Sequence, residues 1–187
     1  MIESELTDEQ LIERVHAGEA SLYGIIMDRY AEKLIRYGRK FVADSTSIED
    51  TVQDIFANAY CNINSFDTSR KFQSWIYRIA HNAFVNLLRQ KKRAWLRVEW
   101  DTLVTLPSFD TYDEDERERK EMAKLIDAGL EGLSENYREI LLLHYQHNFA
   151  YKDISEVLHI PMGTVAIRIK RAREALKKLL PQDVYEK

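Results

Sequence analysis

The chain has 187 residues and a net charge of −4, which is long enough for one large domain or two small ones. Its single cysteine, Cys61, excludes an internal disulfide and a cysteine metal cluster within one chain, and no apolar run approaches the roughly 20 residues of a membrane-spanning helix. The acidic N-terminus lacks the basic segment and the apolar segment of a signal peptide, so a cytoplasmic protein without membrane insertion is expected. Few prolines and glycines, with apolar residues at helical spacing, favour an all-α fold.

The N-terminal half of the sequence predicts four helices in succession. They are expected over 8–17 with Thr7 as N-cap, 20–42, 48–63 with Ser47 as N-cap, and 71–97. The second helix carries apolar and aromatic residues at core spacing, namely Leu22, Ile26, Tyr30, Leu34 and Tyr37.

The third helix has two chemically different faces. One arc is apolar and consists of Ile48, Val52, Ile55, Phe56, Ala59 and Ile63. Asp50 and Asp54 lie opposite that arc at i,i+4, where two like charges destabilise a helix by a few tenths of a kcal/mol. A destabilising pair of this kind is explained if the two carboxylates bind a basic surface of a partner protein. The alternatives are an ordinary solvated face and a carboxylate metal site, for which no histidine at helical spacing completes the ligand set.

The fourth helix combines an expected core arc with a polar stripe. The core arc is Phe72, Ile76, Ile79, Ala80, Ala83 and Leu87. The polar stripe on the other side is Trp75, Arg78, Asn82, Asn86, Arg89 and Arg93. Cations for phosphates, amides for base edges and an aromatic ring for stacking are what opened DNA requires. The alternative for Trp75 is burial in the core.

An acidic stretch divides the sequence into two bodies. Residues 101–121 hold eight acidic and three basic residues and show no sustained apolar period. Residues 71–100 hold seven Lys or Arg and one acid, and residues 168–178 hold six bases and one acid. The charge pattern predicts two anion-binding surfaces on two small helical domains joined by a flexible linker, with domains at 1–98 and 117–187 and the linker at 99–116.

The C-terminal body predicts a helix-turn-helix. Helices are expected over 114–130, 135–146 after a Ser134 cap, 151–158 and 162–180. Ile154 and Leu158 are expected to face the last helix, whose core stripe is Val165, Ile169, Ala172, Leu176 and Leu179. Thr164, Ile167, Lys170 and Arg171 fall on the opposite side, which a recognition helix offers to the major groove of DNA.

Three stretches together resemble bacterial RNA polymerase sigma factors of the extracytoplasmic-function class. "SENYREILLLHYQHNFAYKDISEVLHIPMGTVAIRIKRAREALKKLL" resembles the domain that binds the minus-thirty-five promoter element. It does so through Tyr137-Arg138, Ile154, Gly163-Thr164-Val165, Arg168 and the "RAREALKKL" tail. "IEDTVQDIFANAYCNINSF" resembles the core-polymerase-binding region, and "RKFQSWIYRIAHNAFVNLLRQKKRAW" resembles the region that melts and reads the minus-ten element. The resemblance covers about residues 20–180 in the same order.

The resemblance implies an alternative sigma factor, a non-enzymatic subunit that joins core polymerase, recognises two promoter elements and helps open the duplex. It implies polymerase contacts from Glu49, Asp50, Gln53 and Asp54, and minus-ten contacts from the polar stripe. It implies minus-thirty-five contacts from Thr164, Ile167, Arg168, Lys170 and Arg171. The expected partners are core RNA polymerase, promoter DNA and an anti-sigma factor. No cofactor, metal or obligate homo-oligomer is expected.

The sequence departs from the family pattern at a few positions. Asp153 stands where Glu is usual, Ser155 where Ala is usual, and His159 where a turn glycine is usual. Asn86 stands where Asp is usual, and Ala166-Ile167 replaces a Lys-Ser-like pair. Ile167 is therefore expected to contact a thymine methyl, the alternative being that it packs on the preceding helix.

Two rival functions remain open from the residues alone. A stand-alone helix-turn-helix repressor would normally dimerise on a palindrome and would not need the acidic third helix. A helical metallohydrolase would use Glu49, Asp50, Asp54 and histidines. Separately, His144 and His147 at i,i+3 could bind a metal, but two histidines alone are usually structural or exposed. Cys61 could sense oxidants, but a lone helical cysteine is more often inert.

Overall fold

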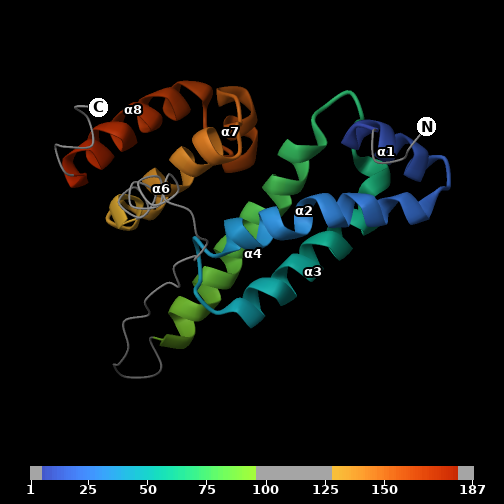
Figure 1. Cartoon of the computed structure of the whole chain (residues 1–187), viewed down its shortest axis with the longest axis horizontal. Helices are drawn as coiled ribbons and strands as arrows, with labels where there is room; N and C mark the ends of the chain where they lie inside the picture. Colours follow the sequence, from blue (N-terminus) through green and yellow to red (C-terminus); the bar gives the residue numbers. More distant parts are fainter. Residues whose placement is uncertain (1–5, 96–127, 181–187) are drawn as a thin grey trace, which may run out of the picture. The chain divides into compact units, whose positions relative to one another are not determined.

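The computed structural model describes residues 6–95 and 128–180, with side chains placed for 6–91 and 128–180. The chain divides into two compact units, one containing α1 to α4 and the other containing α6, the first part of α7 and α8, and each is described by itself. All regular structure in the described stretches is helical, which confirms the all-α prediction (Figure 1). The expected linker at 99–116 and most of the helix expected over 114–130 lie outside the described residues.

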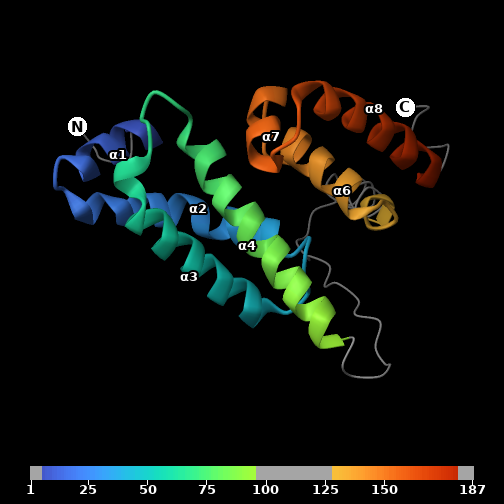
Figure 2. The ribbon, with the colours of Figure 1, turned by 180° about the vertical axis from the view of Figure 1, so that it is seen from behind.

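The N-terminal unit is a bundle of three long helices with a short helix at one end. Figures 1 and 2 show α2, α3 and α4 running alongside one another, with α1 at the end where α2 begins. The helices are α1 Asp8–His16, the 3-10 turn Ala20–Leu22, α2 Tyr23–Gly38, α3 Ser45–Cys61, the 3-10 turn Ile63–Ser65 and α4 Phe72–Trp95.

Capping of α1 follows the prediction. The Thr7 hydroxyl accepts from the Gln10 amide at 3.3 Å, and the Gln10 side chain accepts from the Thr7 amide at 2.9 Å. This reciprocal capping box satisfies two backbone donors that a helix start leaves unpaired.

Two predicted helix boundaries are wrong. The helix expected over 20–42 is a 3-10 turn followed by α2, and α2 ends at Gly38, after which single-turn bonds such as Phe41 N to Gly38 O at 2.9 Å carry the chain. Ser47 is not an N-cap, because α3 begins at Ser45 and Asp44 occupies the cap position. The Ser47 hydroxyl instead donates to the Asp44 carboxylate.

The predicted cores of α2 and α3 are confirmed. Every residue assigned to the apolar arc of α3 and to the core of α2 is buried. The predicted core of α4 is partly wrong, because Tyr77 and Phe84 are fully buried while Ile79, Ala83 and Leu87 are only half-buried. The buried face is rotated by about 40° from the predicted arc. The cause is an aromatic cluster in which Tyr37 of α2 lies 5.2 Å from Tyr77 and 6.0 Å from Phe84, centroid to centroid.

The C-terminal unit is built from α6 Glu135–Leu141, a π-helical turn Leu142–Gln146, α7 Tyr151–Leu158 and α8 Met162–Leu179. Helical backbone also covers 128–131, and α6 packs along α8. The π turn ends α6 with the bond from His147 N to Leu142 O at 3.1 Å, so the helix expected over 135–146 changes type in its last turn. Ser134 holds the cap position but makes no capping side-chain bond.

Arg138, one of the residues that carry the family resemblance, has a structural role in this unit. Its guanidinium donates to the carbonyls of Leu130 at 2.8 Å and Glu131 at 2.5 Å. The last carbonyls of a helix lack intrahelical donors, so these bonds satisfy the end of the helical segment at 128–131 and join it to α6.

Candidate functional sites

The acidic surface, defined as Glu49, Asp50, Gln53 and Asp54, lies on the solvent side of α3. All four side chains are exposed, while the opposite arc of the helix is buried against α2 and α4. The Tyr23 hydroxyl of α2 donates to the Phe56 carbonyl of α3 at 2.9 Å, which helps fix how the two helices face each other. The structure therefore brings the predicted carboxylates together on a supported, solvent-facing helix.

An exposed aromatic residue extends this surface. Tyr60 is 43% exposed, and its ring lies 5.0 Å from that of Tyr23, centroid to centroid. It follows Gln53 by seven residues, which is two helical turns, so it shares the Gln53 side of α3. Helical arithmetic could have found Tyr60 in the sequence. Aromatic residues are enriched at protein interfaces, which makes it a candidate addition to the acidic surface.

The polar stripe of α4 is on the solvent side over its described length. Asn82, Asn86 and Arg89 are exposed, and Trp75 and Arg78 are half-buried. Arg93 lies on α4, but its side chain falls outside the described residues. The stripe faces away from the buried arc of Phe72, Ile76, Tyr77, Ala80 and Phe84.

Trp75 is neither fully exposed, as a DNA contact would be, nor fully buried, as a core residue would be. Its ring lies 5.2 Å from Phe66 and 5.6 Å from Phe72, centroid to centroid, and the residue is half-buried. The indole therefore packs on the aromatic cluster of Phe66 and Phe72 and remains partly accessible. This burial fixes the ring at the head of the polar stripe.

The loop before α4 has a defined turn. The Asp67 carboxylate accepts from the Ser69 amide at 3.0 Å, and the Asp67 carbonyl accepts from the Arg70 amide at 3.0 Å. The hydrogen bonds from Ser69 lower the pKa of the Asp67 carboxyl below its ordinary value. An aspartate that bonds the backbone two residues ahead is a common way to fix a short turn.

The helix-turn-helix has the predicted elements, and the residues that depart from the family pattern have visible roles. His159 adopts the left-handed conformation with φ of 52°, which explains why glycine suits this position. The Ser155 hydroxyl donates to the Ile160 carbonyl across the turn at 2.6 Å, and Asp153 accepts from the Ala150 amide at 3.2 Å. Side-chain hydrogen bonds thus hold both ends of α7.

The outer face of α8 presents several of the predicted DNA contacts. Ile167 is 56% exposed and Arg171 is exposed, while Thr164 and Arg168 are half-buried. The buried stripe is Val165, Ile169 and Ala172. The prediction that Leu179 joins this stripe is wrong, because it is 48% exposed, and Leu176 is only half-buried. The exposure of Ile167 does not support packing of this side chain on the preceding helix.

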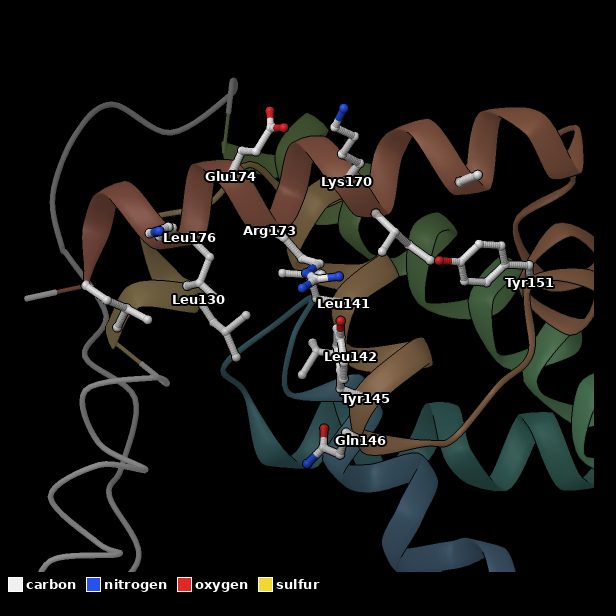
Figure 3. Close-up of a pocket in the computed structure, with 14 residues that line it drawn as sticks. Leu130, Leu141, Leu142, Tyr145, Gln146, Tyr151, Lys170, Arg173, Glu174 and Leu176 are labelled. Atoms are coloured by element: carbon white, nitrogen blue, oxygen red, sulfur yellow. The ribbon is translucent and has the colours of Figure 1, made fainter. Parts of the chain in front are cut away.

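A groove of about 840 Å³ lies between α6 and α8 (Figure 3). Its apolar lining includes Leu130, Leu141, Leu142, Ile169 and Leu176, and Tyr145 and Tyr151 contribute rings. Lys170, Arg173 and Lys177 of α8 also line it. Lys170 was predicted to contact DNA; it borders the groove, about 60° around the helix from Ile167, and its side chain points away from Leu141 and Leu142 (Figure 3). The sequence did not predict the groove, because its walls come from separate helices.

The remaining candidate ligands do not cluster. Among the side chains of 6–91 and 128–180, no three His, Cys, Asp or Glu residues are arranged to hold a metal ion. His144 Nδ1 lies 3.0 Å from the Phe149 carbonyl, so its ring serves the turn after the π helix. Cys61 is exposed. No helix in the described part of the chain has the length and apolar character to cross a membrane.

Each of the two units matches a known protein family model. Residues 26–94 match the family model Sigma-70 region 2, and residues 123–176 match Sigma-70, region 4. The chain is 33% identical over 183 residues to the ECF RNA polymerase sigma factor SigW of Bacillus subtilis, covering 94% of this chain and 98% of that protein. It is 32% identical over 181 residues to the ECF RNA polymerase sigma-E factor of Haemophilus influenzae, covering 92% and 95%.

Solved structures show the same fold. CnrH in complex with the cytosolic domain of CnrY is similar with a TM-score of 0.66 and 24% identity, covering 92% of this chain and 96% of that one. The sigma factor RpoE in complex with the anti-sigma factor NepR from Bartonella quintana has a TM-score of 0.65 and 22% identity, covering 84% and 95%. The family models and the relatives that match over nearly their whole length show that the chain belongs to the extracytoplasmic-function (ECF) sigma factors of the sigma-70 family.

Proposed function

We propose that this alternative sigma factor, which serves promoter recognition and transcription initiation, divides that work among three helical surfaces. The acidic surface of α3 binds core RNA polymerase, the polar stripe of α4 contacts the opened minus-ten element, and the outer face of α8 reads the minus-thirty-five element. The observation that carries the proposal is the arrangement of α3 and α4. Each helix buries an apolar arc. On its other side, α3 exposes the acidic surface, and α4 exposes the cations and amides of the polar stripe.

The chemistry of the polar stripe suits single-stranded DNA. Arg89 supplies a cation for phosphates, and the exposed amides of Asn82 and Asn86 can pair with base edges. Trp75, held by Phe66 and Phe72, offers an aromatic surface at the head of the stripe. Capture of unpaired bases offsets the cost of melting, so contacts of this kind act after the duplex opens.

We expect the protein to act in the cytoplasm as a binding subunit without catalysis, because bacterial RNA polymerase works there and performs the chemistry itself. An anti-sigma factor is a proposed partner. The solved neighbours named above are complexes of a sigma factor with the anti-sigma factor NepR and of CnrH with CnrY. The fold that this chain shares with them supports an expectation of regulation by a bound protein.

Run-off transcription tests the proposal as a whole. Purified protein is added to sigma-free core polymerase with sheared DNA from the source genome, and new transcripts are mapped. We expect transcripts that depend on this protein and share two upstream elements. Tight, sequence-specific DNA binding by the protein alone, with no transcription, would instead favour a repressor.

Residue variants test the assignment of the polar stripe. Asn82→Ala and Arg89→Ala should reduce open-complex formation on duplex promoters by about tenfold each and reduce it less on pre-melted templates. Gln90→Ala is the control on the same helix, because Gln90 is exposed and lies about 80° from Asn82 and about 100° from Arg89 around the helix axis. Permanganate footprinting reports opening. Equal losses on both templates would assign the effect to folding or general affinity.

A further inference from the structure

Helix α1 is bonded to both ends of the segment that leads from α3 into α4. His16, the last residue of α1, donates from Nε2 to the Ile63 carbonyl at 2.8 Å, just beyond the end of α3. Glu9, in the first turn of α1, accepts from the backbone amide of Phe72 at 2.9 Å, and Phe72 is the first residue of α4. One short helix therefore fixes where this connecting segment begins and where it ends.

α1 is itself firmly attached to the bundle. Leu11 and Ile12 are fully buried. The Asp8 carboxylate accepts from the Tyr30 hydroxyl at 2.5 Å and from the Arg29 guanidinium at 2.7 Å, both on α2. With its position set by α2, α1 can act as a rigid reference for the start of α4.

The bond from Glu9 supplies what the local sequence of α4 lacks. The first amides of a helix have no intrahelical acceptor, and Ser, Thr, Asp or Asn usually supplies one from the position before the helix. Lys71 stands at that position, and an ammonium group cannot accept a hydrogen bond. Glu9 provides the acceptor from 63 residues away, and its negative charge also suits the positive end of the helix dipole.

Phe72, whose amide Glu9 accepts from, also packs against the head of the polar stripe. The Phe72 ring lies 5.4 Å from Phe66 and 5.6 Å from Trp75, centroid to centroid, so the backbone amide that Glu9 holds belongs to the residue that supports Trp75. We infer that Glu9 is a positioning residue for minus-ten recognition, which it serves by fixing the first turn of α4 and, with it, Trp75 and the head of the polar stripe. This inference rests on the proposed function of the stripe.

The test compares Glu9→Ala, which removes the acceptor, with Glu9→Gln, which keeps an oxygen that can accept. Glu13→Ala is the matched control, because Glu13 is an exposed acid on the same helix. Hydrogen exchange of the Phe72 amide, measured by NMR on the full-length free protein, should accelerate about tenfold in Glu9→Ala. It should stay near the wild-type rate in Glu9→Gln and Glu13→Ala.

The functional arm uses the holoenzyme on duplex and pre-melted promoters. Glu9→Ala should lower open-complex formation on duplex DNA by three- to tenfold and lower it less on pre-melted DNA, with unchanged affinity for core polymerase. Glu9→Gln should restore most of the activity.

Three results would overturn the inference. They are an unchanged Phe72 exchange rate in Glu9→Ala, wild-type opening by Glu9→Ala, and a uniform rise in exchange across the buried core with no rescue by Gln. A wild-type protein that opens no promoter would instead refute the proposed function, and the Phe72 exchange rates would still report whether Glu9 caps α4.

Discussion

The Lys91 ammonium of α4 lies 2.9 Å from the Asp44 carboxylate, at the position where α3 begins. This ion pair joins the helix that carries the polar stripe to the helix that carries the acidic surface. The hydroxyl of Ser47 and the ammonium of Lys91 lower the pKa of Asp44 from 3.8 to about 2. Because the carboxylate is exposed, solvent screens the pair and its effect on stability is small.

Stability should respond to pH through Asp44 with a definite sign. A carboxyl group whose pKa is lower in the folded state stabilises the fold above its unfolded pKa, and this contribution is lost as the pH falls through the folded pKa. We expect Asp44→Asn to lower the melting temperature by only about one degree at pH 7. The gap to wild type should narrow between about pH 4 and pH 2.

Thermal unfolding of wild type and Asp44→Asn across pH 2 to 7 measures this gap in melting temperature. Asp28→Asn, an exposed carboxylate of α2, controls for the general effect of removing a negative charge. A melting-temperature gap that stays constant down to pH 2 would show that Asp44 acts only through its shape at the helix start.

Charge reversal at Asp54 should weaken the binding of core polymerase by roughly tenfold or more, because it places a cation where a basic partner is proposed. The side chain is exposed opposite the buried arc of α3, so the free energy of unfolding should change by less than about 0.5 kcal/mol. Pull-down with core polymerase and a thermal melt measure the two quantities. Asp28→Arg is the matched control on α2, and normal binding by Asp54→Arg would remove the acidic surface from the interface.

Substitution of Ile167 should change base preference without unfolding the C-terminal unit. A lysine in place of this 56% exposed side chain loses the contact to a thymine methyl and can reach a guanine instead. Selection from a randomised upstream element should therefore show altered preference at one or two positions, with stability within about 0.5 kcal/mol of wild type.

Ile169→Ala is the contrasting control for Ile167. The Ile169 side chain is 2% exposed, so its truncation should destabilise the unit by about 2 to 4 kcal/mol and leave the base preference unchanged. Lowered stability of Ile167→Lys with the original base preference would assign Ile167 to packing.

Two glycines of the same helix should respond oppositely to alanine. A Cβ at Gly38 would lie 2.5 Å from Cζ of Phe84 and 2.9 Å from Cγ2 of Ile48, so Gly38→Ala should destabilise the protein by about 1 to 3 kcal/mol. A Cβ at Gly24 would meet nothing within 4 Å, so Gly24→Ala should stabilise it by about 0.5 to 1 kcal/mol. Denaturant midpoints measure both. Equal effects would show that Phe84 can move aside.

The local pattern of the sequence was sufficient wherever structure depends on near neighbours. The helical class, the Thr7 N-cap, the buried arc of α3 and the two helices of the helix-turn-helix were all predicted. Residues three and four positions apart share a helix face whatever the rest of the chain does. For the same reason the acidic surface and the polar stripe could be assigned to solvent-facing sides. Their roles in binding stay predictions.

Tertiary packing decided the features that depend on distant residues. The core of α4 turned toward Tyr77 and Phe84 because Gly38 leaves room for Phe84 against α2, and no pattern within α4 encodes that space. The bonds of Glu9 to Phe72 and of Asp44 to Lys91 join residues 63 and 47 positions apart. Sequence periodicity gives the direction of a side chain around its own helix. The distance between two helices follows from how their side chains interlock, and that is fixed only when the bundle is packed.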